Sequence, residues 1–163
     1  MESRVKILGH SIHPMLVVVP LGSFIAAVIV DVIGVVSGNQ ALAVVGFWSI
    51  AVGVVGGLLA AAFGLADWLN IPSRTRAKRI GLMHGLLNVA VTVTFALVWL
   101  MRYGTVDVTP SATLLAVEVG ALIGGAAAGW LGGELVERLG VGVDEGANLN
   151  APSSLSGRVG RSA

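Results

Sequence analysis

Long apolar stretches alternate with short polar clusters along the chain, and this pattern predicts four membrane-crossing helices. The stretches cover residues 14–36, 42–69, 80–101 and 111–135. A hydrocarbon core about 30 Å thick is crossed by about 20 helical residues, so each stretch is long enough. In lipid, every backbone N–H and C=O must find a partner within its own segment, which requires helices. We therefore expect an all-α fold, a four-helix transmembrane bundle.

The polar segments divide the chain into three parts. Turn-forming residues at 37–40 and 103–105 separate the first two spans and the last two spans. We expect residues 1–13 to lie at the membrane surface and residues 14–143 to form one membrane domain. Residues 144–163 are rich in Gly, Ser, Asn and Ala, and we expect a disordered tail there.

The distribution of basic residues predicts the orientation of the bundle. Nine of the ten Lys and Arg residues lie before the first span, between the second and third spans, or after the fourth span, which all fall on one side of the membrane. Only Arg102 lies on the opposite side. Short loops rich in Lys and Arg stay in the cytoplasm. We therefore expect a multi-pass protein of the bacterial inner membrane with both termini cytoplasmic. The first apolar stretch is too long for a signal peptide and should remain as a helix.

Composition excludes several classes of protein. The chain is 55% apolar and 12% charged, with a mean hydropathy of +0.89, whereas soluble domains carry about 25% charge. A soluble enzyme is therefore excluded, and the bilayer is the first expected partner. The absence of cysteine excludes disulfides, thiolate zinc sites, iron–sulfur clusters and covalent haem. A net charge of +1 argues against nucleic-acid binding.

Small residues recur at helical spacing within the spans and predict close helix contacts. One row in the second span consists of Gly53, Gly57, Ala60 and Gly64, and rows in the fourth contain Gly120 and Gly124, and Gly125, Gly129 and Gly133. We expect these rows to pack within one bundle, with a homodimer face on the fourth helix as the alternative. Pro20 should kink the first span.

Polar side chains concentrate at the cytoplasmic ends of the spans. Acidic residues inside a bilayer are costly and usually mark functional sites. Asp31 and Glu118 lie toward the outer side, and no basic residue falls within a span as drawn. The inner ends hold a larger set: His10, His13, Asp67, His84, Asn88 and Glu134.

A weak internal repeat relates the two halves of the domain. The first and third helices both start near a histidine, His13 and His84. The second and fourth helices both end near a tryptophan and an acid: Asp67 with Trp68, and Trp130 with Glu134. The pattern predicts a two-fold repeat of helix pairs in which His13 and His84 approach a common axis.

Four ordered blocks carry a family resemblance over roughly residues 7–143. They are GHSIHPMLV at 9–17, FGLADW at 63–68, RIGLMHGLLN at 79–88 and GWLGGELV at 129–136. The chain resembles domain of unknown function family 2231, a family of bacterial membrane proteins. The resemblance implies a four-span inner-membrane protein, some of whose relatives look fused to Rieske-type or cytochrome domains. This chain has no such domain, so a redox role would need a separate partner.

Three functions are consistent with these residues. We favour a packing or assembly subunit of a larger membrane complex, a redox complex among the candidates, acting as a homo-oligomer or with a redox partner. In that case His84 would form a hydrogen bond with Asp67 or Glu134. Trp68 and Trp130 would anchor the helices at the membrane–water interface, near the lipid headgroups. No Ser or Thr has a credible base beside it, so we do not expect an enzyme.

The first alternative is a cofactor site for electron transfer. A b-type haem would take His13 and His84 as axial ligands, with His10 as a substitute for His13. Pro14 disfavours helical geometry at His13. A divalent metal would instead use His10, His13, Asp67, His84 and Glu134, and Asn88 would orient a ligand ring.

The second alternative is a proton or ion pathway. Its relay groups would be Asp31 and Glu118 on the outer side. On the inner side they would be Asp67, His84 and Glu134. Four helices offer little volume for transport unless the protein oligomerises.

Overall fold

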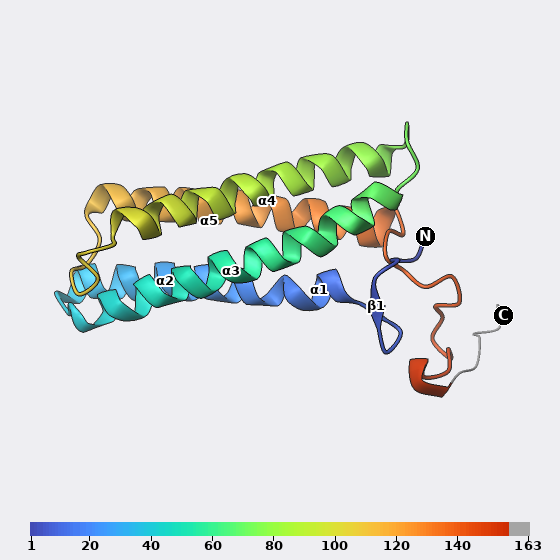
Figure 1. Cartoon of the computed structure of the whole chain (residues 1–163), viewed down its shortest axis with the longest axis horizontal. Coiled ribbons are helices and arrows are strands. Elements are labelled where there is room, and N and C mark those ends of the chain that lie inside the picture. Colours follow the sequence, from blue (N-terminus) through green and yellow to red (C-terminus); the bar gives the residue numbers. More distant parts are fainter. Residues whose placement is uncertain (157–163) are drawn as a thin grey trace.

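Four long helices lie side by side in an elongated bundle, and the chain enters and leaves at the same end (Figure 1). The computed structural model describes residues 1–156. Its elements in chain order are β1 (Lys6–Ile7), β2 (His10–Ser11), α1 (Ile12–Leu16), α2 (Val18–Ser37), α3 (Ala41–Asn70), α4 (Arg76–Met101), α5 (Ala112–Gly133), the π-helical turn η1 (Glu134–Arg138) and the 3-10 turn η2 (Ser154–Ser156). Within the described part of the chain, four helices are long and apolar enough to cross a membrane, which confirms the predicted fold class.

The first span is broken near its start, as Pro20 predicts. Proline has no N–H, so Pro20 cannot bond the carbonyl of Leu16, the last residue of α1. The helix is interrupted at Val17, between α1 and α2. His13 lies within α1, so the expectation that Pro14 keeps it out of helical geometry is wrong. The short antiparallel pair β1–β2 before α1 has no counterpart in the predicted elements.

The third span begins earlier than the hydropathy pattern predicts. Thr75 caps α4 by accepting a hydrogen bond from the amide of Lys78. This cap satisfies one of the free N–H groups at the helix start. Arg76, Lys78 and Arg79, expected in a loop, therefore form the first turn of α4.

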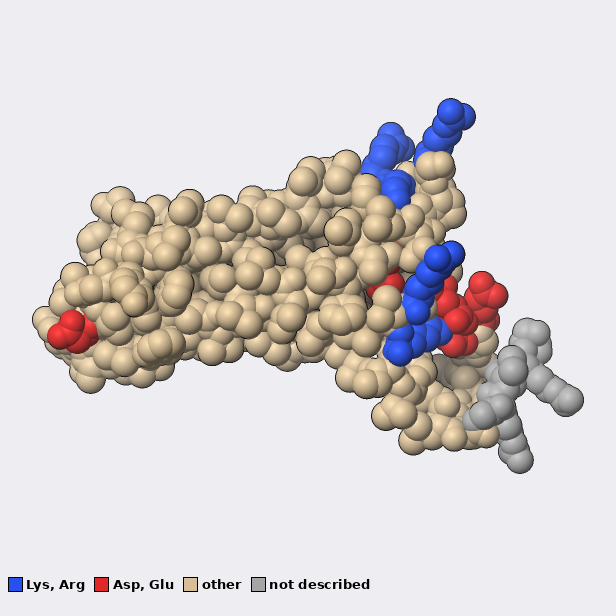
Figure 2. Space-filling model, viewed as in Figure 1, with Lys and Arg blue, Asp and Glu red and all other residues tan. Residues whose placement is uncertain are grey.

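The surface of the bundle between its two ends is apolar. Figure 2 shows no Lys or Arg along the middle of the bundle on this face. Charged side chains gather at the end that holds the termini, and one acid lies at the far end. Large apolar side chains on all sides face outward, with Leu58 63% exposed and Ile123 67% exposed. Such a surface is stable against lipid tails and not against water.

The centre of the bundle is held by an aromatic stack between the two halves. Phe24 of α2 lies parallel to Phe95 of α4, with ring centroids 4.1 Å apart and planes 4° apart. Both rings belong to one buried apolar cluster, whose other members are Ala27 and Val28 of α2, Ile50 of α3, and Val91 and Val98 of α4.

Glycines on α3 make room for the side chains at the centre. A Cβ on Gly53 would overlap the Phe24 ring, and a Cβ on Gly57 would lie 3.0 Å from the Thr92 hydroxyl. The predicted small-residue row of the second span therefore packs inside the bundle. On α5, a Cβ added to Gly124 or Gly132 would meet α4 side chains, whereas a Cβ on Gly120, Gly129 or Gly133 would meet nothing within 4 Å.

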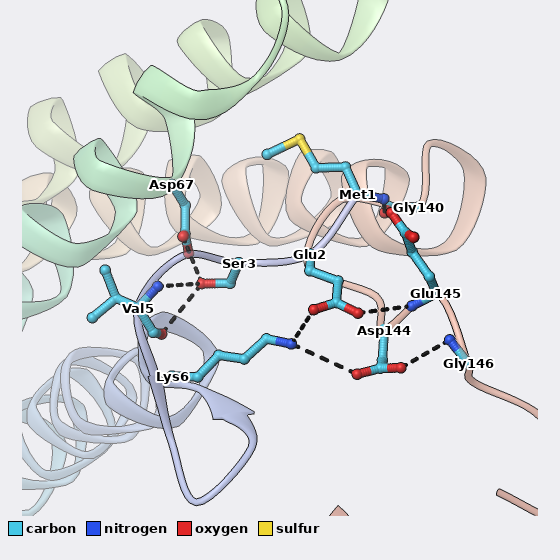
Figure 3. Close-up of polar contacts among 10 residues, drawn as sticks. All are labelled: Met1, Glu2, Ser3, Val5, Lys6, Asp67, Gly140, Asp144, Glu145 and Gly146. Atoms are coloured by element: carbon cyan, nitrogen blue, oxygen red, sulfur yellow. Dashed lines mark hydrogen bonds and ion pairs between the residues drawn. The ribbon is translucent and has the colours of Figure 1, made fainter. Parts of the chain in front are cut away.

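The two terminal segments bind each other at the end of the bundle (Figure 3). We call residues 1–6 and 140–146 the terminal clasp. The Met1 ammonium donates to the carbonyl of Gly140 at 3.0 Å, and the amide of Gly142 donates back to the Met1 carbonyl at 2.8 Å. Lys6 bridges Glu2 at 2.6 Å and Asp144 at 3.6 Å. The predicted disordered tail thus begins with ordered contacts at residues 144–146, and residues 157–163 lie outside the described part.

The glycine contacts predict a selective sensitivity to added methyl groups. Gly53→Ala should lower the free energy of unfolding by about 1–3 kcal/mol, because the methyl group overlaps the Phe24 ring. Gly120→Ala, at an open position, should leave stability unchanged or raise it by up to about 1 kcal/mol. Thermal unfolding in detergent, followed by circular dichroism, measures both. Equal effects of the two variants would contradict the packing described for α3.

The terminal clasp should open in acid. The hydrogen bond from Lys6, followed by that from the Glu145 amide, lowers the pKa of Glu2, and the same carboxylate raises the pKa of Lys6. The contribution of Glu2 is therefore present above its ordinary pKa of 4.5 and is lost as the pH falls through the lowered pKa.

Spin labels on cysteines introduced at Arg4 and Ala147 can measure this opening, since the chain has no cysteine of its own. The distance distribution should be narrow at neutral pH and broad in acid. Glu2→Gln should broaden it at every pH, and Glu137→Gln, at an exposed position outside the clasp, should not. A narrow distribution for Glu2→Gln at neutral pH would rule out the proposed role of this ion pair.

Candidate functional site

Two histidines from different halves of the bundle face each other near the end that holds the termini. The ring centroids of His13 on α1 and His84 on α4 lie 6.4 Å apart, with the planes at 85°. These are the two residues that the sequence singles out as a haem ligand pair, and the structure brings them together.

Each histidine is held by the helix of the next membrane span along the chain. Nδ1 of His13 lies 2.9 Å from the carbonyl oxygen of Ala60 on α3, and Nδ1 of His84 lies 2.8 Å from that of Ala128 on α5. A glycine one turn further along supports each ring. A Cβ on Gly64 would lie 2.8 Å from the His13 ring, and a Cβ on Gly132 would lie 3.1 Å from the His84 ring. The two rings therefore have corresponding carbonyl and glycine contacts.

The equivalence extends along the bundle and supports the predicted two-fold repeat. Three pairs that meet between the halves are each separated by 71 residues in the chain: His13 with His84, Phe24 with Phe95, and Asp31 with Arg102. The supporting residues are separated by 68: Ala60 with Ala128, and Gly64 with Gly132. A separation of 68 residues aligns Asp67 with Leu135 and not with Glu134. The predicted correspondence between the Trp and acid residues at the two helix ends therefore differs from the repeat that these contacts define.

The other inner residues of the predicted metal set lie apart from the histidine pair. Asp67 accepts a hydrogen bond from the Ser3 hydroxyl at 2.6 Å. Glu134 pairs with Arg76, and His10 is exposed, with Nδ1 3.2 Å from the Leu8 carbonyl oxygen. Among residues 1–156, no group of three or more His, Asp or Glu side chains is placed to hold a metal ion. The expected bond from His84 to Asp67 or Glu134 is replaced by the bond to Ala128.

Three further predicted residues surround this end of the bundle. The Asn88 amide nitrogen lies 2.9 Å from the His84 carbonyl oxygen and 3.2 Å from Nε2 of the His84 ring. Trp68 donates from Nε1 to the Lys78 carbonyl, and the Lys78 ammonium lies 3.8 Å from the centroid of the Trp68 ring. Trp130 is 69% exposed on the outer surface of α5. Asn88 therefore contacts His84 of the histidine pair, and Trp68 joins α3 to α4.

A second polar group is buried near the opposite end of the bundle. The guanidinium of Arg102 donates to Asp31 through Nη1 at 2.6 Å and Nη2 at 3.1 Å, and to Glu118 through Nη1 at 3.4 Å. Nη2 also donates to the Ala43 carbonyl on α3 at 3.0 Å. The exposed fraction is 2% for the Arg102 side chain and 0% for both carboxylates. We call Asp31, Arg102 and Glu118 the charged trio.

Arg102 is the buried charged residue that the sequence analysis does not predict. It follows the last residue of α4 directly, and the sequence places it outside the spans, on the side opposite the other bases. The side chain is long enough to lie back along apolar helices while its charged head reaches a partner deeper in the bundle. Two acids within spans, with a single base at the same end, were the signal that could have indicated this pairing.

The family comparison agrees with this architecture. A family model described as a predicted membrane protein, DUF2231, matches residues 9–145, a range that includes the four long helices, the histidine pair and the charged trio. No curated protein and no solved structure matches the chain.

The buried trio predicts a large cost for removing its cation. Arg102→Gln should lower the free energy of unfolding by about 3–5 kcal/mol, because it leaves buried carboxylate oxygens without donors. Arg76→Gln, which removes the more exposed pair with Glu134, should cost less than about 1 kcal/mol. Unfolding in mixed micelles of increasing denaturing-detergent fraction compares the two variants. A cost for Arg102→Gln no larger than that for Arg76→Gln would contradict the importance of this pairing.

Proposed function

We propose, from the premise that the chain belongs to the predicted membrane protein family DUF2231, that it carries a b-type haem for electron transfer within the membrane. His13 and His84 would hold the haem iron. The observation that carries the proposal is their arrangement, because the two rings face each other from the two halves of the bundle and each is oriented by a backbone carbonyl.

The carbonyl contacts determine which ring nitrogen is free to bind iron. A carbonyl oxygen only accepts hydrogen bonds, so Nδ1 of each histidine must carry a proton to make the observed contact. In a neutral imidazole, Nε2 then has the unshared pair that binds a metal. Histidine ligands in proteins are commonly fixed in this way, through a bond from the other ring nitrogen. The Asn88 amide, which lies near Nε2 of His84, has an alternative acceptor in the His84 carbonyl.

The two rings are close enough that both histidines could hold one haem iron. Their centroids lie 6.4 Å apart, and an imidazole nitrogen binds a metal at about 2 Å.

The number of ligands favours haem over a bare metal ion. Zinc sites use at least three protein ligands, and the described residues place only two histidines here. A porphyrin already supplies four nitrogens to its iron, so two histidines complete the coordination. Gly64 and Gly132 keep bulk away from the rings.

A haem at this position would exchange single electrons with another protein, because the chain has no cysteine for a second redox group of the iron–sulfur type. We place the site at the cytoplasmic end of a bacterial inner-membrane protein, with both termini inside. The support is the concentration of Lys and Arg at the end that holds the termini. If no haem binds, the packing or assembly role is the hypothesis that remains.

Absorption spectra of detergent-purified protein test the proposal. Protein from haem-replete cells should show a Soret band that shifts on reduction with dithionite. His13→Ala and His84→Ala should each lose or strongly alter this band, since each removes one axial ligand. His10→Ala is the matched control and should keep the native spectrum, because His10 is exposed and bonded only within its own turn.

Two results would overturn the assignment. One is a colourless protein that also takes up no added haemin. The other is a native haem spectrum in both His13→Ala and His84→Ala. A colourless, folded protein would favour the assembly role.

A further inference from the structure

The charged trio collects groups from all four long helices at one point near the end opposite the termini. Asp31 comes from α2, Glu118 from α5 and Arg102 from the end of α4, while α3 contributes the Ala43 carbonyl. The trio also lies against the α3 backbone, since a Cβ on Gly46 would overlap the Asp31 carboxylate. Apart from these side chains, no titratable group within residues 1–156 contacts the trio through a hydrogen bond or ion pair.

The charges of the trio do not balance. One guanidinium faces two carboxylates, which leaves a net charge of −1 when both acids are ionised. Exposed fractions of 0% for both acids mean that water does not compensate this charge. An uncompensated charge in the interior of a bundle is strongly unfavourable.

The hydrogen bonds show where the excess negative charge lies. Asp31 receives both Nη1 and Nη2 of Arg102, so its two oxygens are each paired with a donor. Glu118 receives only the longer bond, at 3.4 Å, and its Oε2 has no partner. Nε of Arg102 is also unpartnered. Asp31 and Arg102 therefore form the ion pair, and Glu118 is left with a buried oxygen that nothing neutralises.

We propose that Glu118 is a proton-binding site, at which one proton from water at this end of the bundle binds the carboxylate and makes the trio neutral. The proton joins a carboxylate oxygen to form a carboxylic acid, and its release returns the net charge of −1. A metal cation is disfavoured, because the guanidinium already lies beside both acids and no third acidic ligand is present among the described residues. The site is separate from the histidine pair, since 18 residues of α4, about 27 Å, separate His84 from Arg102.

Infrared spectroscopy of the purified protein in lipid tests this assignment. A protonated carboxylic acid has a carbonyl stretch that a carboxylate lacks. The wild type at neutral pH should show this band, and transfer into heavy water should shift it because the proton exchanges with solvent. Glu118→Gln should abolish the band. Glu134→Gln, at a partly exposed acid paired with Arg76, should leave it unchanged.

Asp31→Asn makes the test specific for charge balance. Without Asp31, Glu118 becomes the only counter-ion of Arg102, so it should ionise and the band should disappear although Glu118 is still present. Persistence of the band in Asp31→Asn or in Glu118→Gln, or its absence from the wild type, would overturn the proposal. A wild-type band that never shifts in heavy water would show a trapped proton and would contradict exchange. None of these results depends on whether haem binds.

Discussion

A bilayer offers no water to a buried polar group, and the internal organisation of this protein follows from that constraint. The two halves of the bundle meet through three residue pairs: an imidazole pair, an aromatic stack and an ion pair. The polar members of these pairs obtain their partners from neighbouring helices, through the carbonyls of Ala60, Ala128 and Ala43. Small residues of α3 let these side chains approach the backbone. Packing and polar pairing therefore depend on the same close approach of helices.

The repeat shows how one geometry supports different chemistry at different depths. Residues at corresponding positions are identical for the histidines and the phenylalanines, and complementary for Asp31 and Arg102. Identical residues across a two-fold axis suit a shared ligand or a symmetric stack. Like charges facing each other across such an axis would repel, so opposite charges are needed there. The two halves are thus similar in shape and different in charge where they meet.

The sequence predicts the helices well, because hydropathy and span length are properties of each segment alone. It also predicts His13 and His84 as a pair, since both stand at corresponding starts of a helix. It does not predict their carbonyl partners, because backbone acceptors are present at every position and only the packing selects Ala60 and Ala128. The position of Arg102 was missed because hydropathy places a residue by its Cα, whereas a long side chain places its charge elsewhere. The terminal clasp joins residues about 140 positions apart, a separation at which local patterns carry no information.

The pairing of Asp31 with Arg102 has a consequence for how the protein is made. Asp31 leaves the ribosome 71 residues before its cation, so the first helical hairpin reaches the membrane with a carboxylate that lacks its counter-ion. Only the arrival of α4 supplies that counter-ion. The ion pair therefore makes the first half of the chain dependent on the second for its stable place in lipid, and a chain interrupted between them would present an unpaired acid that quality-control proteases of the membrane could recognise.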